Sequence, residues 1–143
     1  MWCFASHFQK SYIANPESVS LRPDFVVLVY PVISMDPKIT HGGSRTALLG
    51  QSPSDALVRQ FSNEQHVTRD TPPTLILHAA DDQLVDIDNS IAFFNALRHA
   101  DVPVEARFFA KGQHGFPLLP RDTWQGAITD WIMSEGWLSP RAK

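Results

Sequence analysis

The sequence has little of several features, and each shortage excludes a class of protein. It contains a single cysteine, Cys3, which excludes an internal disulfide and a zinc-ribbon arrangement. No apolar run approaches the roughly 20 residues that span a bilayer. The 12 lysines and arginines face 15 acidic residues, which argues against nucleic-acid binding by bulk charge. We therefore expect neither a membrane nor a nucleic acid as a partner.

The chain does have enough length and apolar content for one folded domain. Its 143 residues are 43% hydrophobic and 19% charged, a composition that supports a core and argues against disorder. Its 7 glycines and 11 prolines occur without a period, which excludes collagen-like and low-complexity architectures. We expect residues 1–143 to form a single unit. Residues 1–5 are apolar but too short for the core of a signal peptide. A single cysteine leaves the redox compartment open.

Three short runs that follow prolines predict β-strands, over residues 25–30, 74–79 and 104–109. The first two are almost continuously apolar, which is typical of parallel strands covered on both faces. The third alternates more and is expected nearer an edge of the sheet. Because helical patterns separate the strands, the sequence predicts an α/β fold with a parallel sheet.

Helical periodicity fills most of the remaining chain. One apolar stripe consists of Ile87, Ile91, Phe94 and Leu97. Asp86 or Asp88 is expected to cap this helix, and Pro103 to end it. Further helices are predicted over residues 2–13, 56–61 and 124–131, the last with Asp122 as its cap. Residues 33–70 form a long, polar connection, which is typical of an insertion that carries function or forms a lid.

Two polar loops follow adjacent predicted strands and carry the residues best suited to chemistry. Asp81 and Asp82 come after the strand 74–79, and His114 follows the strand 104–109. About 30 residues separate Asp82 from His114, the length of one βα unit, so the two strands are expected to be parallel neighbours. Open α/β sheets bind ligands at the carboxyl ends of their strands. An aspartate there can orient a histidine ring and stabilise its protonated form.

Simpler interpretations exist for each loop. An Asp-Asp pair after a strand is a common turn or helix cap. A histidine between glycines is often an ordinary loop residue, although Gly112 and Gly115 would let the backbone turn sharply and present the ring. Asp81, Asp82 and His114 could also bind a metal, but no spacing such as His-Glu-x-x-His supports that. Two such loops one βα unit apart favour a paired acid and base.

These motifs resemble the C-terminal part of an α/β-hydrolase, from the esterase-like group that includes acetyl-xylan esterases and carboxylesterases. The resemblance covers nearly the whole chain and rests on residues 22–34, 39–50, 72–85 and 112–116. It implies a three-layer partial α/β-hydrolase fold with about three parallel strands and flanking helices. One departure is Asp86, where the group commonly has proline.

The resemblance also assigns roles and a reaction. Asp82 matches the acid of a catalytic triad, with Asp81 as the fallback, and His114 matches the general base. The implied reaction is the hydrolysis of small carboxylic esters, such as acetyl groups on carbohydrates, without a cofactor or a metal. His78 is interpreted as a packed structural histidine, and Phe116 and Trp124 as core residues that could instead line an acyl pocket.

The nucleophile that such a hydrolase needs has no match in the sequence. The group places its serine in Gly-x-Ser-x-Gly on a strand-to-helix elbow, and no such motif occurs in the 143 residues. The helix predicted over residues 2–13 resembles the one that follows the elbow, which puts the serine and the oxyanion hole a few residues before Met1. Cys3 and Ser6 are poorer candidates, because both fall on that helix. We therefore expect little or no esterase activity from this chain alone.

Three hypotheses stay open at this point. The chain could represent the C-terminal part of a serine esterase, a hydrolase completed by a partner chain, or a catalytically inactive truncated fragment that forms a structural dimer. In a complete fold the strand from Phe25 to Tyr30 would pair with the nucleophile strand, so its apolar edge is expected to be unpaired. A symmetric homo-oligomer through this edge would cover it.

Overall fold

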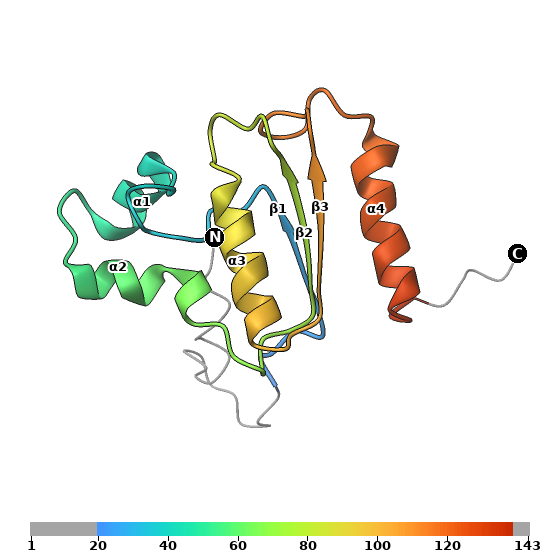
Figure 1. Ribbon diagram of the computed structural model, residues 1–143, viewed down its shortest axis with the longest axis horizontal. Helices are drawn as coiled ribbons and strands as arrows, with labels where there is room; N and C mark the ends of the chain where they lie inside the picture. Colours follow the sequence, from blue (N-terminus) through green and yellow to red (C-terminus); the bar gives the residue numbers. More distant parts are fainter. Residues whose placement is uncertain (1–19, 139–143) are drawn as a thin grey trace, which may run out of the picture.

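The structure of the protein, a computed structural model, describes residues 20–138 and contains one parallel sheet (Figure 1). Its strands are β1 (Val26–Val29), β2 (Thr74–Ala79) and β3 (Val104–Phe109), in the order β1–β2–β3. In the register, Thr74 of β2 lies between Val26 of β1 and Val104 of β3. The three predicted strands and the α/β fold are confirmed.

The burial of the strands follows their sequence patterns. All six residues of the central strand β2 are buried, as its continuous apolar run predicts. The alternating strand β3 lies at one edge of the described sheet and is mostly half-buried. The strand predicted to end at Tyr30 ends one residue earlier. Tyr30 still donates its backbone N–H to Leu77 at 2.8 Å, but its φ of 41° turns the chain out of the sheet before Pro31.

Helices cover both faces of the sheet and make three layers (Figure 1). Helix α3 (Asp88–His99) packs on one face and α4 (Arg121–Ser134) on the other. Alternate residues of β2 point to opposite layers, because side chains alternate along a strand. Ile76 packs with Phe93 and Leu97 of α3, whereas Leu75 and Leu77 pack in the cluster of α4.

The face of α3 that is buried differs from the predicted apolar stripe. Ile91 is 38% exposed. The fully or nearly buried residues of the helix are Asn89, Ser90, Phe93 and Leu97. The prediction followed apolar side chains alone, and two of the four buried positions are polar. Asn89 and Ser90 are buried because each has hydrogen-bond partners in the interior.

The ends of the two long helices also depart from the sequence predictions. Asp86 accepts a hydrogen bond from the backbone N–H of Asp88 at 2.9 Å, but the N-cap of α3 is Ile87, which makes no side-chain cap, rather than the predicted Asp86 or Asp88. That helix ends at His99, before Pro103, and Asp101 then takes a φ of 57°. Helix α4 begins after Pro120 without a side-chain cap, and Asp122 lies in its first turn rather than at the cap. An acidic residue there still favours the helix dipole.

The connection over residues 33–70 is more ordered than its glycines and serines predict. It contains α1 (Gly42–Leu49), α2 (Asp55–Phe61) and a short 3₁₀ helix η1 (Asn63–Gln65), on the α3 side of the sheet. Helix α2, predicted over residues 56–61, is capped by the side chain of Ser54. Helix α1 was not predicted, because two glycines open it. The ring of His41 caps it by accepting from the backbone N–H of Ser44 at 3.2 Å.

Several sequence predictions fall outside the described residues or are untested by them. The helix predicted over residues 2–13, with Cys3 and Ser6, lies outside the described range. Within residues 20–138, β1 is the outermost strand on its side and pairs only with β2. Association through this edge stays a prediction. Over the same residues, no helix is long and apolar enough to cross a membrane.

Candidate active site

The candidate site lies at the carboxyl ends of β2 and β3, at the upper end of the sheet in Figure 1. Asp81 and Asp82 follow β2 directly, and the loop with His114 follows β3. The two strands are hydrogen-bonded neighbours, with Ala79 beside Phe109 at their last pair. Both loops therefore leave the sheet side by side, as the spacing of one βα unit predicts.

The structure brings Asp82 and His114 into direct contact. Nδ1 of His114 lies 2.9 Å from Oδ2 of Asp82. The side chain of Asp82 is completely buried, while that of His114 is 32% exposed. Because a carboxylate can only accept, the ring donates its Nδ1–H, and Nε2 keeps a free lone pair in the neutral ring. This is the tautomer that a general base needs.

The carboxylate of Asp82 is held by two loops and a strand. Its Oδ1 accepts from the backbone N–H of Leu84 at 2.9 Å and of Val85 at 3.0 Å. Its Oδ2 also lies 3.2 Å from Nε2 of His78. Burial acts to raise the pKa of Asp82, but the bonds from Val85 and His114, with that from Leu84, together lower it below its ordinary value. Asp82 is therefore ionised at neutral pH.

The neighbouring Asp81 holds the histidine loop rather than the histidine ring. Its Oδ1 accepts from the backbone N–H of Gly112 at 2.8 Å and of Gln113 at 2.9 Å. These bonds, led by that from Gln113, lower the pKa of Asp81. The structure thus brings Asp82, and not the fallback Asp81, to His114. Asp81 instead fastens the β3 loop to the β2 loop.

The backbone around His114 is bent more sharply than its two glycines alone would require. Gly115 has a φ of 82°, and the non-glycine residues Gln113 and Phe116 also have positive φ, 59° and 56°. Gly112 is needed for another reason. A Cβ there would lie 3.0 Å from that of Ala79 at the end of β2 and 3.1 Å from the side chain of Leu119, so a side chain would have to push these neighbours aside. The predicted sharp turn is present, with Gly115 in the left-handed region.

A cluster of aromatic rings adjoins His114 through Tyr30. The ring of Tyr30, at the end of β1, lies 4.5 Å from that of His114 between centroids. Phe116 is 3% exposed and packs against Tyr30 at 5.0 Å and Phe109 at 5.4 Å. Phe116 is therefore a core residue, as its preferred interpretation predicts. Trp124 lies 5.9 Å from Phe116 and is half-buried.

Sequence reasoning missed two residues of the site, Tyr30 and His78. It interpreted Tyr30 only as part of a strand, and His78 as packing alone. One signal could have found both. Tyr30 lies at the carboxyl end of β1, beside the strand that leads to Asp82, and His78 lies near that of β2, beside the strand that leads to His114. Residues at the carboxyl ends of adjacent parallel strands meet at one edge.

The same geometry bears on the metal alternative. Over residues 20–138, no group of three His, Cys, Asp or Glu side chains is arranged to hold a metal ion. One oxygen of Asp81 faces the amides of Gly112 and Gln113, not the pair of Asp82 and His114.

Comparison with known proteins now identifies the family. Residues 24–135 match the prolyl oligopeptidase family. The chain belongs to this family. A solved structure of an acetyl ester-xyloside bifunctional hydrolase from Caldicellulosiruptor lactoaceticus has a TM-score of 0.79 and 40% identity, over 85% of this chain and 46% of that one. The resemblance to an esterase-like α/β-hydrolase is thereby confirmed.

Two curated relatives are similar to this chain over most of its length. The chain is 38% identical over 124 residues to endo-1,4-beta-xylanase B of Butyrivibrio fibrisolvens, covering 85% of this chain and 19% of that protein. It is 36% identical over 110 residues to acetylxylan esterase of Xylanibacter ruminicola, covering 74% of this chain and 23% of that protein. The chain therefore spans less than half the length of each of these three relatives.

Proposed function

We propose that this chain supplies the acid–base pair of a serine carboxylic-ester hydrolase that acts on small acyl esters. The hydrogen bond between Asp82 and His114 carries the proposal. A wholly buried, ionised carboxylate accepts Nδ1–H from a part-exposed ring whose Nε2 has no hydrogen-bond partner among residues 20–138. The names of the relatives point to acetyl groups on xylan-type carbohydrates as the first substrate class to test.

The pair would act through one proton carried on Nε2 of His114. In acylation, Nε2 takes the proton of a serine hydroxyl as its oxygen attacks the ester carbonyl, and then gives that proton to the departing alkoxide. In deacylation, water is deprotonated in the same way and the serine regains its proton. Asp82 stabilises the imidazolium formed in each step. It also keeps Nε2 free for the reaction.

The serine and the oxyanion donors are assigned to a segment outside residues 20–138. No Gly-x-Ser-x-Gly motif occurs in the sequence. An oxyanion hole in this fold needs the backbone N–H that follows the serine and another from an upstream loop. The proposal therefore concerns the chemistry that Asp82 and His114 perform when such a segment is in place. A test must supply the segment and ask whether the pair works.

A chimeric enzyme provides that test. Residues 24–135 replace the matching segment of the Caldicellulosiruptor hydrolase, and hydrolysis of an aryl acetate is measured. We expect turnover that falls by about 10³-fold or more with His114→Ala or Asp82→Asn. The matched controls His99→Ala and Asp122→Asn change exposed residues of the same types and should leave the rate unchanged.

Two outcomes separate this function from its main competitor. A folded chimera without turnover would favour the second candidate, a catalytically inactive member that retains the pair. Assaying the unmodified chain with the same ester and a serine-directed phosphonate adds a further distinction. Turnover that disappears with His114→Ala would place a nucleophile within the 143 residues, whereas an active chimera and an inactive chain would place it elsewhere.

A further inference from the structure

The buried histidine of β2 makes more contacts with the site than packing requires. The side chain of His78 has no exposed surface, and it lies on the face of the sheet toward α3. Its Nδ1 is 2.7 Å from the hydroxyl of Ser90 on α3. Its Nε2 is 3.2 Å from Oδ2 of Asp82 and 3.0 Å from the carbonyl of Val85. Both ring nitrogens therefore have partners.

These contacts settle where the proton of His78 lies. A carbonyl oxygen and an ionised carboxylate can only accept, so Nε2 must carry the proton and donate it to both. Nδ1 then holds the lone pair, and the hydroxyl of Ser90 donates to it. Burial lowers the pKa of His78, outweighing the opposing effects of Val85 and Asp82. The ring is thus a neutral donor at pH 7.

We propose that His78 is a positioning residue of the acid–base pair, whose neutral Nε2–H holds Oδ2 of Asp82 in place for His114. The inference rests on the proposed function for its catalytic meaning. Val85 and Asp82 fix the tautomer of His78, and Ser90 donates to its other ring nitrogen. His78 in turn holds Asp82, and Asp82 fixes the tautomer of His114. The hydrogen bonds run without a break from the interior of α3 to the part-exposed ring of His114.

A neutral donor suits this position better than a cation. The buried carboxylate of Asp82 needs hydrogen bonds to stay ionised, and its remaining oxygen sites are taken by Leu84 and Val85. If His78 were protonated, its positive charge would compete with the imidazolium of His114 for Oδ2 of Asp82. A neutral imidazole at His78 adds a hydrogen bond, and the negative charge of Asp82 then remains available to stabilise the imidazolium of His114.

A matched pair of variants isolates that hydrogen bond. Gln places an amide N–H near the position of Nε2, so His78→Gln keeps a donor to Asp82. Asn is shorter and reaches only the position of Nδ1, so His78→Asn stays polar but lacks that donor. The readout is the pKa of the Asp82 carboxyl in the full chain, followed by carbon NMR, with circular dichroism to verify the fold. The titratable groups that face this carboxyl are His78 from β2 and His114 from the β3 loop.

We expect His78→Asn to raise the pKa of Asp82 by about one unit, since the charged form loses one hydrogen bond. His78→Gln should return the pKa close to that of the unmodified chain, and the surface variant His99→Asn should not move it. An unchanged pKa in His78→Asn, or equal rises in the Asn and Gln variants, would overturn the proposal, because packing alone would then explain His78. Should His78→Asn not fold, His78→Phe serves as the variant without a donor.

This readout does not depend on ester hydrolysis. A pKa shift rescued by Gln, in a protein whose chimera is inactive, would support the positioning contact and count against the proposed hydrolase function. If the chimera is active but the pKa of Asp82 does not change with His78→Asn, the hydrolase function is supported and the positioning contact is contradicted.

Discussion

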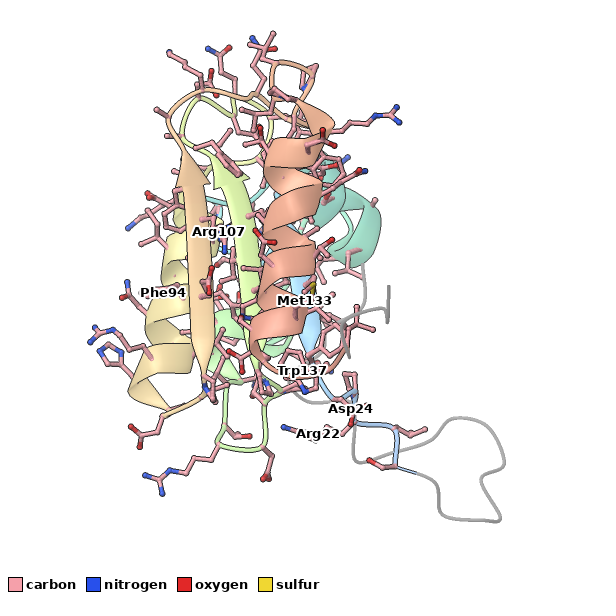
Figure 2. All side chains as sticks on the ribbon, turned by 90° about the vertical axis from the view of Figure 1, so that its right-hand side faces the viewer. Arg22, Asp24, Phe94, Arg107, Met133 and Trp137 are labelled. Atoms are coloured by element: carbon pink, nitrogen blue, oxygen red, sulfur yellow. The ribbon has the colours of Figure 1, made fainter. Side chains whose placement is uncertain are left out.

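The two faces of the sheet differ in the side chains that pack against them. Toward α4 the interior is aromatic, with Phe25, Trp131 and Trp137 in mutual contact. Trp137 stacks on Phe25 at 4.6 Å, and Trp131 meets both rings edge to face at 5.8 Å and 4.9 Å. Figure 2 looks onto this layer, where Trp137 lies just past the end of α4. Gly136, with a φ of 77°, turns the chain so that Trp137 folds back on the core.

Toward α3 the interior holds polar side chains that are hydrogen-bonded, among them those of His78, Asn89 and Ser90. Asn89 is completely buried and makes four bonds. Its oxygen accepts from the backbone N–H of Ile33 at 2.9 Å and of Ser34 at 3.0 Å, and its nitrogen donates to the carbonyls of Ile39 and Asp86. His78 and Ser90 lie on the same face. The difference indicates that the aromatic face supplies bulk stability, while the polar face fixes loops and side-chain positions.

The largest expected effect lies on the aromatic face. Trp131→Ala removes a ring that is almost wholly buried between β2 and two other aromatic residues. We expect it to lower the free energy of unfolding by about 3–5 kcal/mol, from lost burial and the cavity left behind. Urea denaturation followed by fluorescence and circular dichroism measures this. Met133→Ala, on the exposed side of the same helix, should cost far less, and equal losses would contradict the assigned role of the aromatic face.

A somewhat smaller effect is expected from the polar face. Asn89→Ala leaves the amides of Ile33 and Ser34 buried without their acceptor, and each orphaned donor costs about 1–3 kcal/mol. With two such donors, we expect the free energy of unfolding to fall by at least roughly 2 kcal/mol. Faster hydrogen exchange of those two amides should accompany it. Asn95→Ala changes the same residue type on the same helix and should cost little, because its side chain has no hydrogen bond within residues 20–138. If both variants behave alike, the polar face has no organising role.

The same contrast explains what the sequence could predict. Apolar patterns located all three strands and the helices α3 and α4, because buried apolar runs are the main signal that a sequence carries. The spacing of one βα unit correctly predicted that the loops of Asp82 and His114 would be neighbours. Asn89 and Ser90 were missed because a pattern search treats buried polar residues as surface. Their burial depends on partners such as Ile33 and His78, which are far away in the sequence.

Sequence patterns also failed to predict helix α1 and the contact of His78 with Asp82. Two glycines argue against a helix start, yet the first turn needs no intrahelical N–H bonds and His41 provides the cap. His78 lies four residues before Asp82, a spacing that brings side chains together on a helix but not on a strand. The loop after β2 folds Asp82 back over His78 by a bond from its own N–H to the carbonyl of Ala79. Sequence spacing alone does not report such a turn.

The smallest effect, and the sharpest test of the polar face, is the pH dependence of stability. The folded protein holds His78 with a lowered pKa, whereas in the unfolded chain it is near 6.5. Between those two values the unfolded state binds more protons than the folded state. Stability therefore falls as the pH drops from about 6.5 to the lowered pKa, and His78 adds no further slope below it.

His78→Gln has no proton to gain, so its stability curve should be flatter than that of the unmodified chain over this window. The other histidines and Asp82 are common to both proteins, so the difference between the two curves isolates His78. Urea midpoints measured at steps between pH 7 and pH 4.5 give the comparison. Parallel curves would mean that His78 charges freely within the fold. The polar face would then not hold it as the neutral donor that Asp82 requires.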